Sequence, residues 1–147
     1  SGGGIFLSGS YIATDPWHGA ESDDADRAFV REVLHYEYGG SAATRSGRVT
    51  AAPSLAKIKG NVRFNQEVCE KHYTVNSPDV LSPTNGSYPI MRYAENGRTA
   101  GVAWSGDYRT LALGFPFESI IDHAEREQLM SSIMEFLFRQ GGTDYMR

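Results

Sequence analysis

Gly4-Ile5-Phe6-Leu7-Ser8-Gly9-Ser10 is the stretch that decides the predicted fold, because it is a short apolar run that ends in a glycine turn. Its length and its bounding glycines favour a buried strand of the parallel-sheet kind. Residues 11–21 contain Pro16 and Gly19 and predict a loop. A helical pattern begins at Ser22. This order of strand, loop and helix predicts an α/β domain.

The predicted first helix has clear signals at both ends. Residues 22–24 are Ser-Asp-Asp, which can cap a first turn and place negative charge at the positive end of the helix dipole. Gly39-Gly40 is the expected stop, because glycine accepts the left-handed conformation past a helix end. The apolar stripe at helical spacing consists of Ala25, Phe29, Val30, Val33 and Leu34.

The second half of the chain predicts an antiparallel meander and a closing helix. Strands are expected over residues 88–94, 99–105 and 108–114, and the first turn contains Asn96-Gly97, a strong hairpin signal. Shorter strands are expected over residues 48–52 and 62–64, and residues 73–87 are expected to form a loop because they hold two prolines and an Asn-Gly pair. The last helix is expected over residues 125–139, with its buried stripe at Leu129, Ile133, Phe136 and Leu137.

Composition limits the class of protein. A chain of 147 residues has room for one core, so a single domain over residues 1–147 is expected. The net charge of −4, without a basic cluster, argues against nucleic-acid binding, and the lack of a long apolar run argues against membrane insertion. Cys69 is the sole cysteine, so an intrachain disulfide is excluded. The chain starts without methionine or a signal peptide, and we expect a processed chain or an excised fragment.

Three groups of residues are candidates for chemistry. Ser8 ends the first strand, where a nucleophile could be exposed; the alternative is that its hydroxyl satisfies backbone groups. Asp15, Trp17 and His18 lie in the following loop, where an α/β sheet usually binds ligands; the alternative is that Trp17 only packs and Asp15 caps a turn. Cys69 and His72 are three residues apart, which is too few ligands for zinc. No metal or cofactor is expected.

Several segments together resemble class I glutamine amidotransferase-like domains of large secreted bacterial proteins that are xanthan lyase-like. The segments are residues 3–15, residues 29–38 and the closing Leu113-Gly114-Phe115-Pro116-Phe117-Glu118-Ser119-Ile120. The resemblance implies a three-layer flavodoxin-like α/β fold with an antiparallel meander toward the C-terminus. It also implies a secreted or cell-surface location. The implied partners are polysaccharide and the other domains of a parent protein, which is itself a candidate polysaccharide lyase.

Two departures from the family's pattern separate this chain from its active members. They use a cysteine at the strand end and a histidine in a segment that reads roughly Gly-x-Gln-Phe-His-Pro-Glu. Here Ser8 stands at the first position and Glu118 at the second, while Gly114 and Phe117 match the motif. Glutamine hydrolysis needs a thiolate and an imidazole, so amidotransferase activity is not expected.

The second departure is that the family has strands before the central one, so the chain is expected to be the C-terminal part of a longer domain or a compact variant. In the first case the sheet should have an open edge that a partner chain or another segment covers.

These observations lead to one interpretation and two alternatives. The interpretation is a non-catalytic module of a secreted polysaccharide-degrading protein, with a structural or ligand-binding role. The first alternative is a serine hydrolase that uses Ser8 together with His18 or Glu118. The second is a polysaccharide-binding module that uses Trp17.

Overall fold

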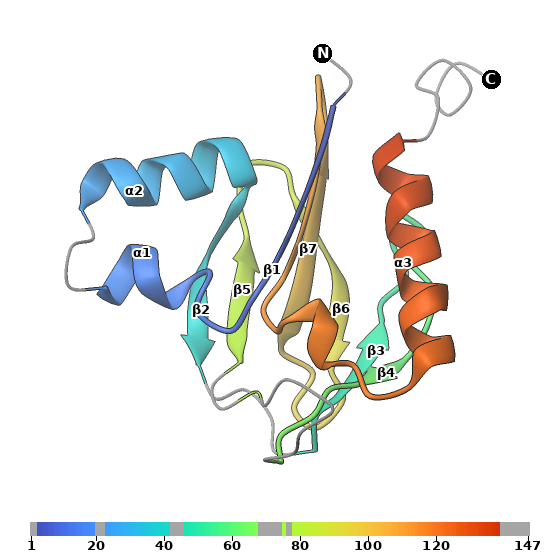
Figure 1. Ribbon diagram of the computed structural model, residues 1–147. Coiled ribbons are helices and arrows are strands. Elements are labelled where there is room, and N and C mark those ends of the chain that lie inside the picture. The colour runs from blue at the N-terminus through green and yellow to red at the C-terminus, as the bar shows by residue number, and fades with distance from the viewer. Residues whose placement is uncertain (1–2, 20–22, 42–45, 68–74, 76–77, 139–147) are drawn as a thin grey trace.

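A six-stranded mixed sheet runs through the middle of the computed structural model (Figure 1), which describes residues 3–19, 23–41, 46–67, 75 and 78–138. The strand order is β1-β8-β7-β6-β3-β4. β1 and β8 are parallel, and each of the other neighbouring pairs is antiparallel. The strands of this sheet are β1 (Gly4–Ser8), β3 (Arg48–Ala51), β4 (Val62–Arg63), β6 (Tyr88–Tyr93), β7 (Thr99–Ser105) and β8 (Arg109–Leu113).

Different elements cover the two faces of this sheet. Helix α3 (His123–Phe138) lies on one side in Figure 1 and is preceded by the 3₁₀ turn η2 (Phe117–Ser119). The other side carries a two-stranded antiparallel sheet and two short helices. These elements are α1 (Thr14–His18), α2 (Asp24–Phe29), the π-helical turn η1 (Val30–Leu34), β2 (Tyr36–Ser41) and β5 (Asp79–Pro83).

The predicted three-layer flavodoxin-like fold is wrong. Such a fold has a mainly parallel sheet whose crossover helices cover both faces. Here a single parallel pair, β1 with β8, sits beside a run of antiparallel strands in a curled mixed sheet, and strand outweighs helix. The antiparallel strands β6, β7 and β8 are joined by short turns, so they leave no room for crossover helices between them.

The meander and the closing helix were predicted correctly. β6, β7 and β8 pair in sequence, as the turn residues indicate. The side chain of Asp122 accepts the backbone N–H of Glu125 at 3.0 Å and caps the first turn of α3. The α3 residues buried against the large sheet are the predicted stripe of Leu129, Ile133, Phe136 and Leu137.

The first helix ends earlier than predicted. It stops at Leu34, because His35 takes a left-handed conformation with φ of 65° and stacks on the ring of Trp104 at a centroid distance of 3.8 Å. The following residues, Tyr36 to Ser41, form β2 instead of a last helical turn. Aromatic residues favour strands, and pairing with β5 outweighs the helical spacing of the sequence. Phe29, expected in the buried stripe, is 55% exposed.

The segment predicted as a loop over residues 73–87 contains a strand. β5 pairs with β2, and Pro83 is its last residue, where a missing N–H does not interrupt the ladder. Its first three residues, Asp79, Val80 and Leu81, are buried. The prolines therefore mark the boundaries of a strand, and the Asn85-Gly86 turn leads on to β6.

β1 pairs in parallel, as predicted, but it lies at the edge of the sheet and not in its interior. Leu7 packs toward the core cluster beneath α1 and β2, whereas Phe6 packs toward the cluster beneath α3. This alternation follows from the two-residue period of a strand. Both faces of β1 are therefore used in packing, although one of its edges has no neighbouring strand in the described part of the chain.

Across the residues that the structure describes, every helix is too short or too polar to cross a bilayer.

Candidate functional site

The candidate site lies where β1 and β8 end side by side. Because the two strands are parallel, their carboxyl ends reach the same edge, and Ser8 stands opposite Leu113 in the register. The N–H of Gly9 donates to the carbonyl of Leu113 at 3.2 Å. The N–H of Phe117 donates to Ser8 Oγ at 3.1 Å, although the two residues are 109 positions apart. The fold thus brings the predicted Ser8 position next to the segment that holds Glu118.

Ser8 Oγ acts here as a hydrogen-bond acceptor. The bond from Phe117 is the only one that the hydroxyl makes within the described part of the chain, and no described imidazole bonds to it. The ring of Phe117 also packs edge-to-face against Phe6, with centroids 6.0 Å apart. Glu118 follows in η2 with an exposed side chain. Among the described residues, Ser8 Oγ therefore has a hydrogen-bond donor, the N–H of Phe117, but no base bonded to it that could take its proton.

A buried carboxylate that sequence reasoning missed organises this edge. Asp79, the first residue of β5, is 0% exposed. Its Oδ2 accepts the backbone N–H of Ala13 at 2.8 Å and that of Thr14 at 3.0 Å, and its Oδ1 accepts the hydroxyl of Thr14 at 2.6 Å. These bonds fix the loop that follows β1 and start α1.

The backbone of Asp79 holds the second loop of the site. Its N–H donates to the carbonyl of Gly114 at 2.7 Å, just after β8, and its carbonyl accepts the hydroxyl of Tyr93. Gly114 approaches so closely that a Cβ added there would lie 2.1 Å from the Asp79 carbonyl oxygen. One residue of β5 therefore ties the chain after β1 to the chain after β8.

Burial dominates the electrostatics of this residue. Removal from water raises the pKa of Asp79; the hydrogen bonds from Thr14 and Ala13 act in the opposite direction, and the charge of Asp15 adds to the increase. Burial, with the Asp79 charge as the smaller cause, also raises the pKa of the Tyr93 and Tyr36 hydroxyls. Both tyrosines therefore remain neutral donors.

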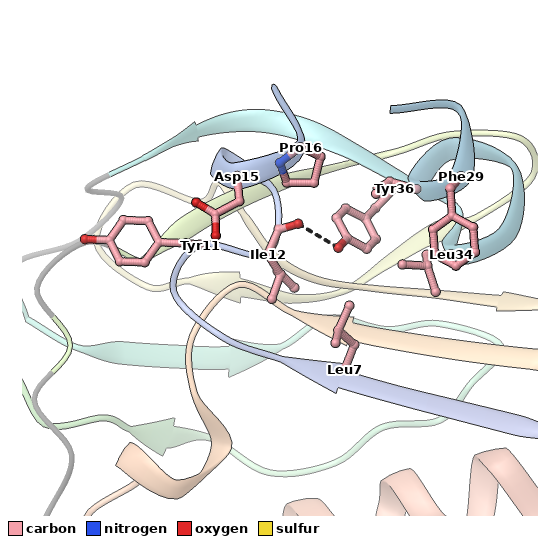
Figure 2. Close-up of a pocket in the computed structure, with 9 residues that line it drawn as sticks. Leu7, Tyr11, Ile12, Asp15, Pro16, Phe29, Leu34 and Tyr36 are labelled. Atoms are coloured by element: carbon pink, nitrogen blue, oxygen red, sulfur yellow. Dashed lines mark hydrogen bonds between the residues drawn. The ribbon is translucent and has the colours of Figure 1, made fainter. Parts of the chain in front are cut away.

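Asp15 lies on an open groove of 380 Å³ next to β1 (Figure 2). The groove is mainly apolar, and its lining includes the exposed side chains of Asp15 and Tyr11, the latter 46% exposed. The hydroxyl of Tyr36 donates to the carbonyl of Ile12 at 2.8 Å and is thereby occupied. The groove is lined by Leu7, Tyr11, Ile12, Asp15, Pro16, Phe29, Val30, Leu34 and Tyr36.

Trp17 and His18 were predicted to act together with Asp15, but they are not among the lining residues named above. Trp17 is half-buried and packs against the core cluster beneath α1 and β2. The guanidinium of Arg31 lies over its ring at 5.5 Å, and Arg31 also pairs with Glu37 at 2.9 Å. His18 ends α1, and its side chain is outside what the structure describes. Cys69 and His72 also lie outside the described residues.

Within the described ranges, no three histidine, cysteine or acidic side chains gather in a way that could hold a metal ion.

Comparison with known proteins gives no family assignment: no protein-family model matches the sequence, and no curated protein matches it significantly. The resemblance to amidotransferase-like domains therefore rests on the quoted residues alone.

We predict that Gly114→Ala abolishes folding or lowers the free energy of unfolding by more than about 3 kcal/mol, because the added methyl would overlap the backbone of Asp79. The matched control is Gly3→Ala, where a Cβ meets nothing within 4 Å. That variant should stay within about 0.5 kcal/mol of the unmodified protein. Urea unfolding followed by circular dichroism measures both, and equal stability of the two variants would contradict the tie between Gly114 and Asp79.

A second prediction concerns the Asp79 side chain. Asp79→Ala leaves three donors of the β1–α1 loop without their acceptor and should lower the free energy of unfolding by about 3–5 kcal/mol at pH 7. Asp79→Asn keeps a carbonyl acceptor and should lose less than half as much. Equal losses in the two variants would show that these hydrogen bonds are not what Asp79 contributes.

The raised pKa gives the same residue a pH signature. The folded carboxyl binds its proton more tightly than the unfolded one, whose pKa is about 3.9. The stability of the unmodified protein relative to Asp79→Asn should therefore increase as the pH falls from 7 toward 4. A relative stability that decreased over this range would mean that the folded pKa is lowered instead.

Proposed function

We propose that this chain is a non-catalytic module of a larger secreted protein that degrades polysaccharide, of the xanthan lyase-like kind, and that its role is structural or ligand-binding. The sequence resemblance to the amidotransferase-like domains of such proteins motivates the parent protein. The loss of catalysis is inferred chiefly from the hydrogen bond that the Phe117 N–H donates to Ser8 Oγ.

The meeting of Ser8 with residues 114–118 supports the resemblance. In active members of the family a thiolate and an imidazole act together, so the strand end and the late segment must be neighbours. In this chain the two corresponding segments are neighbours, joined by the parallel pairing of β1 with β8 and by the Phe117–Ser8 hydrogen bond. The positions fit a degenerate site in which geometry persists without the reacting groups.

The chemistry at Ser8 supports an inactive site. A serine hydroxyl becomes a nucleophile when an adjacent base takes its proton, and the pair must be within hydrogen-bonding reach. The described side chains provide Ser8 with no such acceptor, and the N–H of Phe117 occupies one lone pair of its oxygen. Glu118 is exposed to solvent, and among the described contacts no hydrogen bond joins its side chain to Ser8. A hydrolase that uses Ser8 and Glu118 is therefore the less supported alternative.

A polysaccharide site built on Trp17 is also less supported. Sugar stacking needs an accessible aromatic face, whereas this ring packs on the core and carries Arg31 over it. A ligand-binding role would rely instead on the groove that Tyr11 and Asp15 line.

The proposal predicts that the folded chain neither releases ammonia from glutamine nor reacts at Ser8 with a fluorophosphonate probe. A coupled ammonia assay and mass spectrometry of the probe-treated protein measure the two activities, with an active serine hydrolase as the positive control. Ser8→Ala is the matched variant. Ammonia release or labelling that this variant abolishes would overturn the proposal in favour of catalysis.

If Ser8 serves as an acceptor, Ser8→Ala should lower the free energy of unfolding by about 1 kcal/mol, because the N–H of Phe117 loses its partner. Ser105→Ala, at an exposed position that ends β7, is the control and should change stability by less than about 0.5 kcal/mol. Chemical unfolding of both variants separates the outcomes. An Ser8→Ala protein as stable as the control would argue against this structural role.

A further inference from the structure

The two edge strands of the six-stranded sheet, β4 and β1, differ in length and in charge. At one edge, β4 is only two residues long and carries the charged Arg63. Its backbone is also occupied: the N–H of Arg63 donates to Glu125 Oε1 at 3.2 Å, and its carbonyl accepts the N–H of Ile121 at 3.0 Å. Short length, charge and coverage are the usual protections of an edge strand. β4 has all three.

β1, at the other edge, has none of these protections among the residues that the structure describes. It is a five-residue apolar strand without a charge or a proline, and its register with β8 runs without a bulge. Ile5 in this strand is 38% exposed. An uncovered apolar edge of this kind is a template for pairing with another strand.

The hydrogen-bond ladder identifies the free groups of β1. The carbonyl of Gly3 accepts the N–H of Arg109, and the N–H of Gly9 donates to Leu113, so the odd-numbered residues face β8. In a parallel pair the alternate residues direct their N–H and C=O to the opposite side. The main-chain groups of Gly4, Phe6 and Ser8 therefore point to the open edge, and within the described part of the chain none of them meets a backbone partner there.

The groove beside β1 indicates what kind of strand fits. Leu7 of β1 lines the groove (Figure 2). Ile5 projects to the same face of the strand as Leu7, because the two residues are two positions apart. Side chains of an added strand would enter an apolar channel that continues to Phe29 and Leu34. The groove thus favours apolar residues at alternate positions.

Charge completes the description of the partner. Asp15 lines the groove with an exposed carboxylate that has no ion pair among the described residues. The neighbouring basic side chains are already used, since Arg31 pairs with Glu37 and Arg27 with Asp24. Among the described side chains, the charge left uncompensated beside the groove is negative, so a basic residue on the partner would be attracted to it.

We propose that β1 is the docking edge for an extended segment of another polypeptide, with apolar side chains at alternate positions and a basic residue near its end. The segment adds a strand to the sheet through the main-chain groups of Gly4, Phe6 and Ser8, and its side chains enter the groove. The proposal stands on the edge and the groove, and it is independent of whether Ser8 has catalytic activity.

The test uses hydrogen exchange of individual amides, measured by NMR on the full chain. The probe is a blocked peptide of about seven residues in which valine and threonine alternate between terminal lysines, a length that matches β1. In the free chain the amides of Phe6 and Ser8 should exchange fast and those of Ile5 and Leu7 slowly. Saturating peptide should slow Phe6 and Ser8 by at least about tenfold. A peptide with proline at its centre should have no effect.

Variants connect binding to the proposed surface. Ile5→Lys should weaken binding of the lysine peptide by at least about tenfold, because it places a charge at the edge. Asp15→Asn should weaken it about two- to fivefold. Leu55→Lys, an apolar-to-lysine change at a residue that is 81% exposed in the segment between β3 and β4, is the matched control and should bind normally. Circular dichroism checks that each variant is folded.

Three results would overturn the proposal. Phe6 and Ser8 amides that still exchange fast at saturating peptide would show that the edge does not accept a strand. Amides that are slow in the free chain at every protein concentration would show that the chain covers its own edge. Protection that grows with protein concentration in the absence of peptide would assign the edge to a second copy of this chain.

Discussion

The buried carboxylate of Asp79 is the constraint on which the arrangement of the site depends. A charge removed from water is expensive unless its oxygens are satisfied, and here three donors from the loop after β1 satisfy them. The same residue holds Gly114 through its backbone. Two loops that are a hundred residues apart in sequence are therefore attached to one point. The position of Ser8 beside Phe117 and the shape of the groove beside α1 both follow from this attachment.

Elements whose signals are local were predicted well from the sequence. The meander has a turn at Asn96-Gly97 between β6 and β7, and α3 has a cap at Asp122 and a regular apolar stripe. The errors arise where tertiary contacts decide. Tyr36 and Tyr38 continue a helical pattern in the sequence, but pairing with β5 draws them into a strand. The prediction of the overall sheet was wrong because the strand order, with β1 beside β8, is not encoded in any single segment of the sequence.

The candidate site was predicted in part. The resemblance named Ser8 and Glu118, but periodicity carries no information on contacts between distant strands, so the closeness of Ser8 to residues 114–118 became visible only in the structure. Asp79 could not have been selected, because a lone acid between two prolines looks like a turn residue, and its burial depends on a loop that is distant in sequence. Asp15 lies in a groove as a ligand-binding residue would, while Trp17 next to it packs on the core and is covered by Arg31. The position of a residue in a loop of the sequence therefore did not show whether its side chain faces solvent or packs on the core.

The pairing of β1 with β8 also has a consequence for how the chain acquires its structure. During synthesis β1 emerges first, and its partner follows after more than a hundred further residues. At ordinary translation rates this interval is about 5–20 s. Throughout that time the apolar strand has no ladder to join, so the sheet closes only after translation has passed β8. The pairing of β1 with β8 therefore belongs to a late stage of folding, after the strands between them have been synthesised.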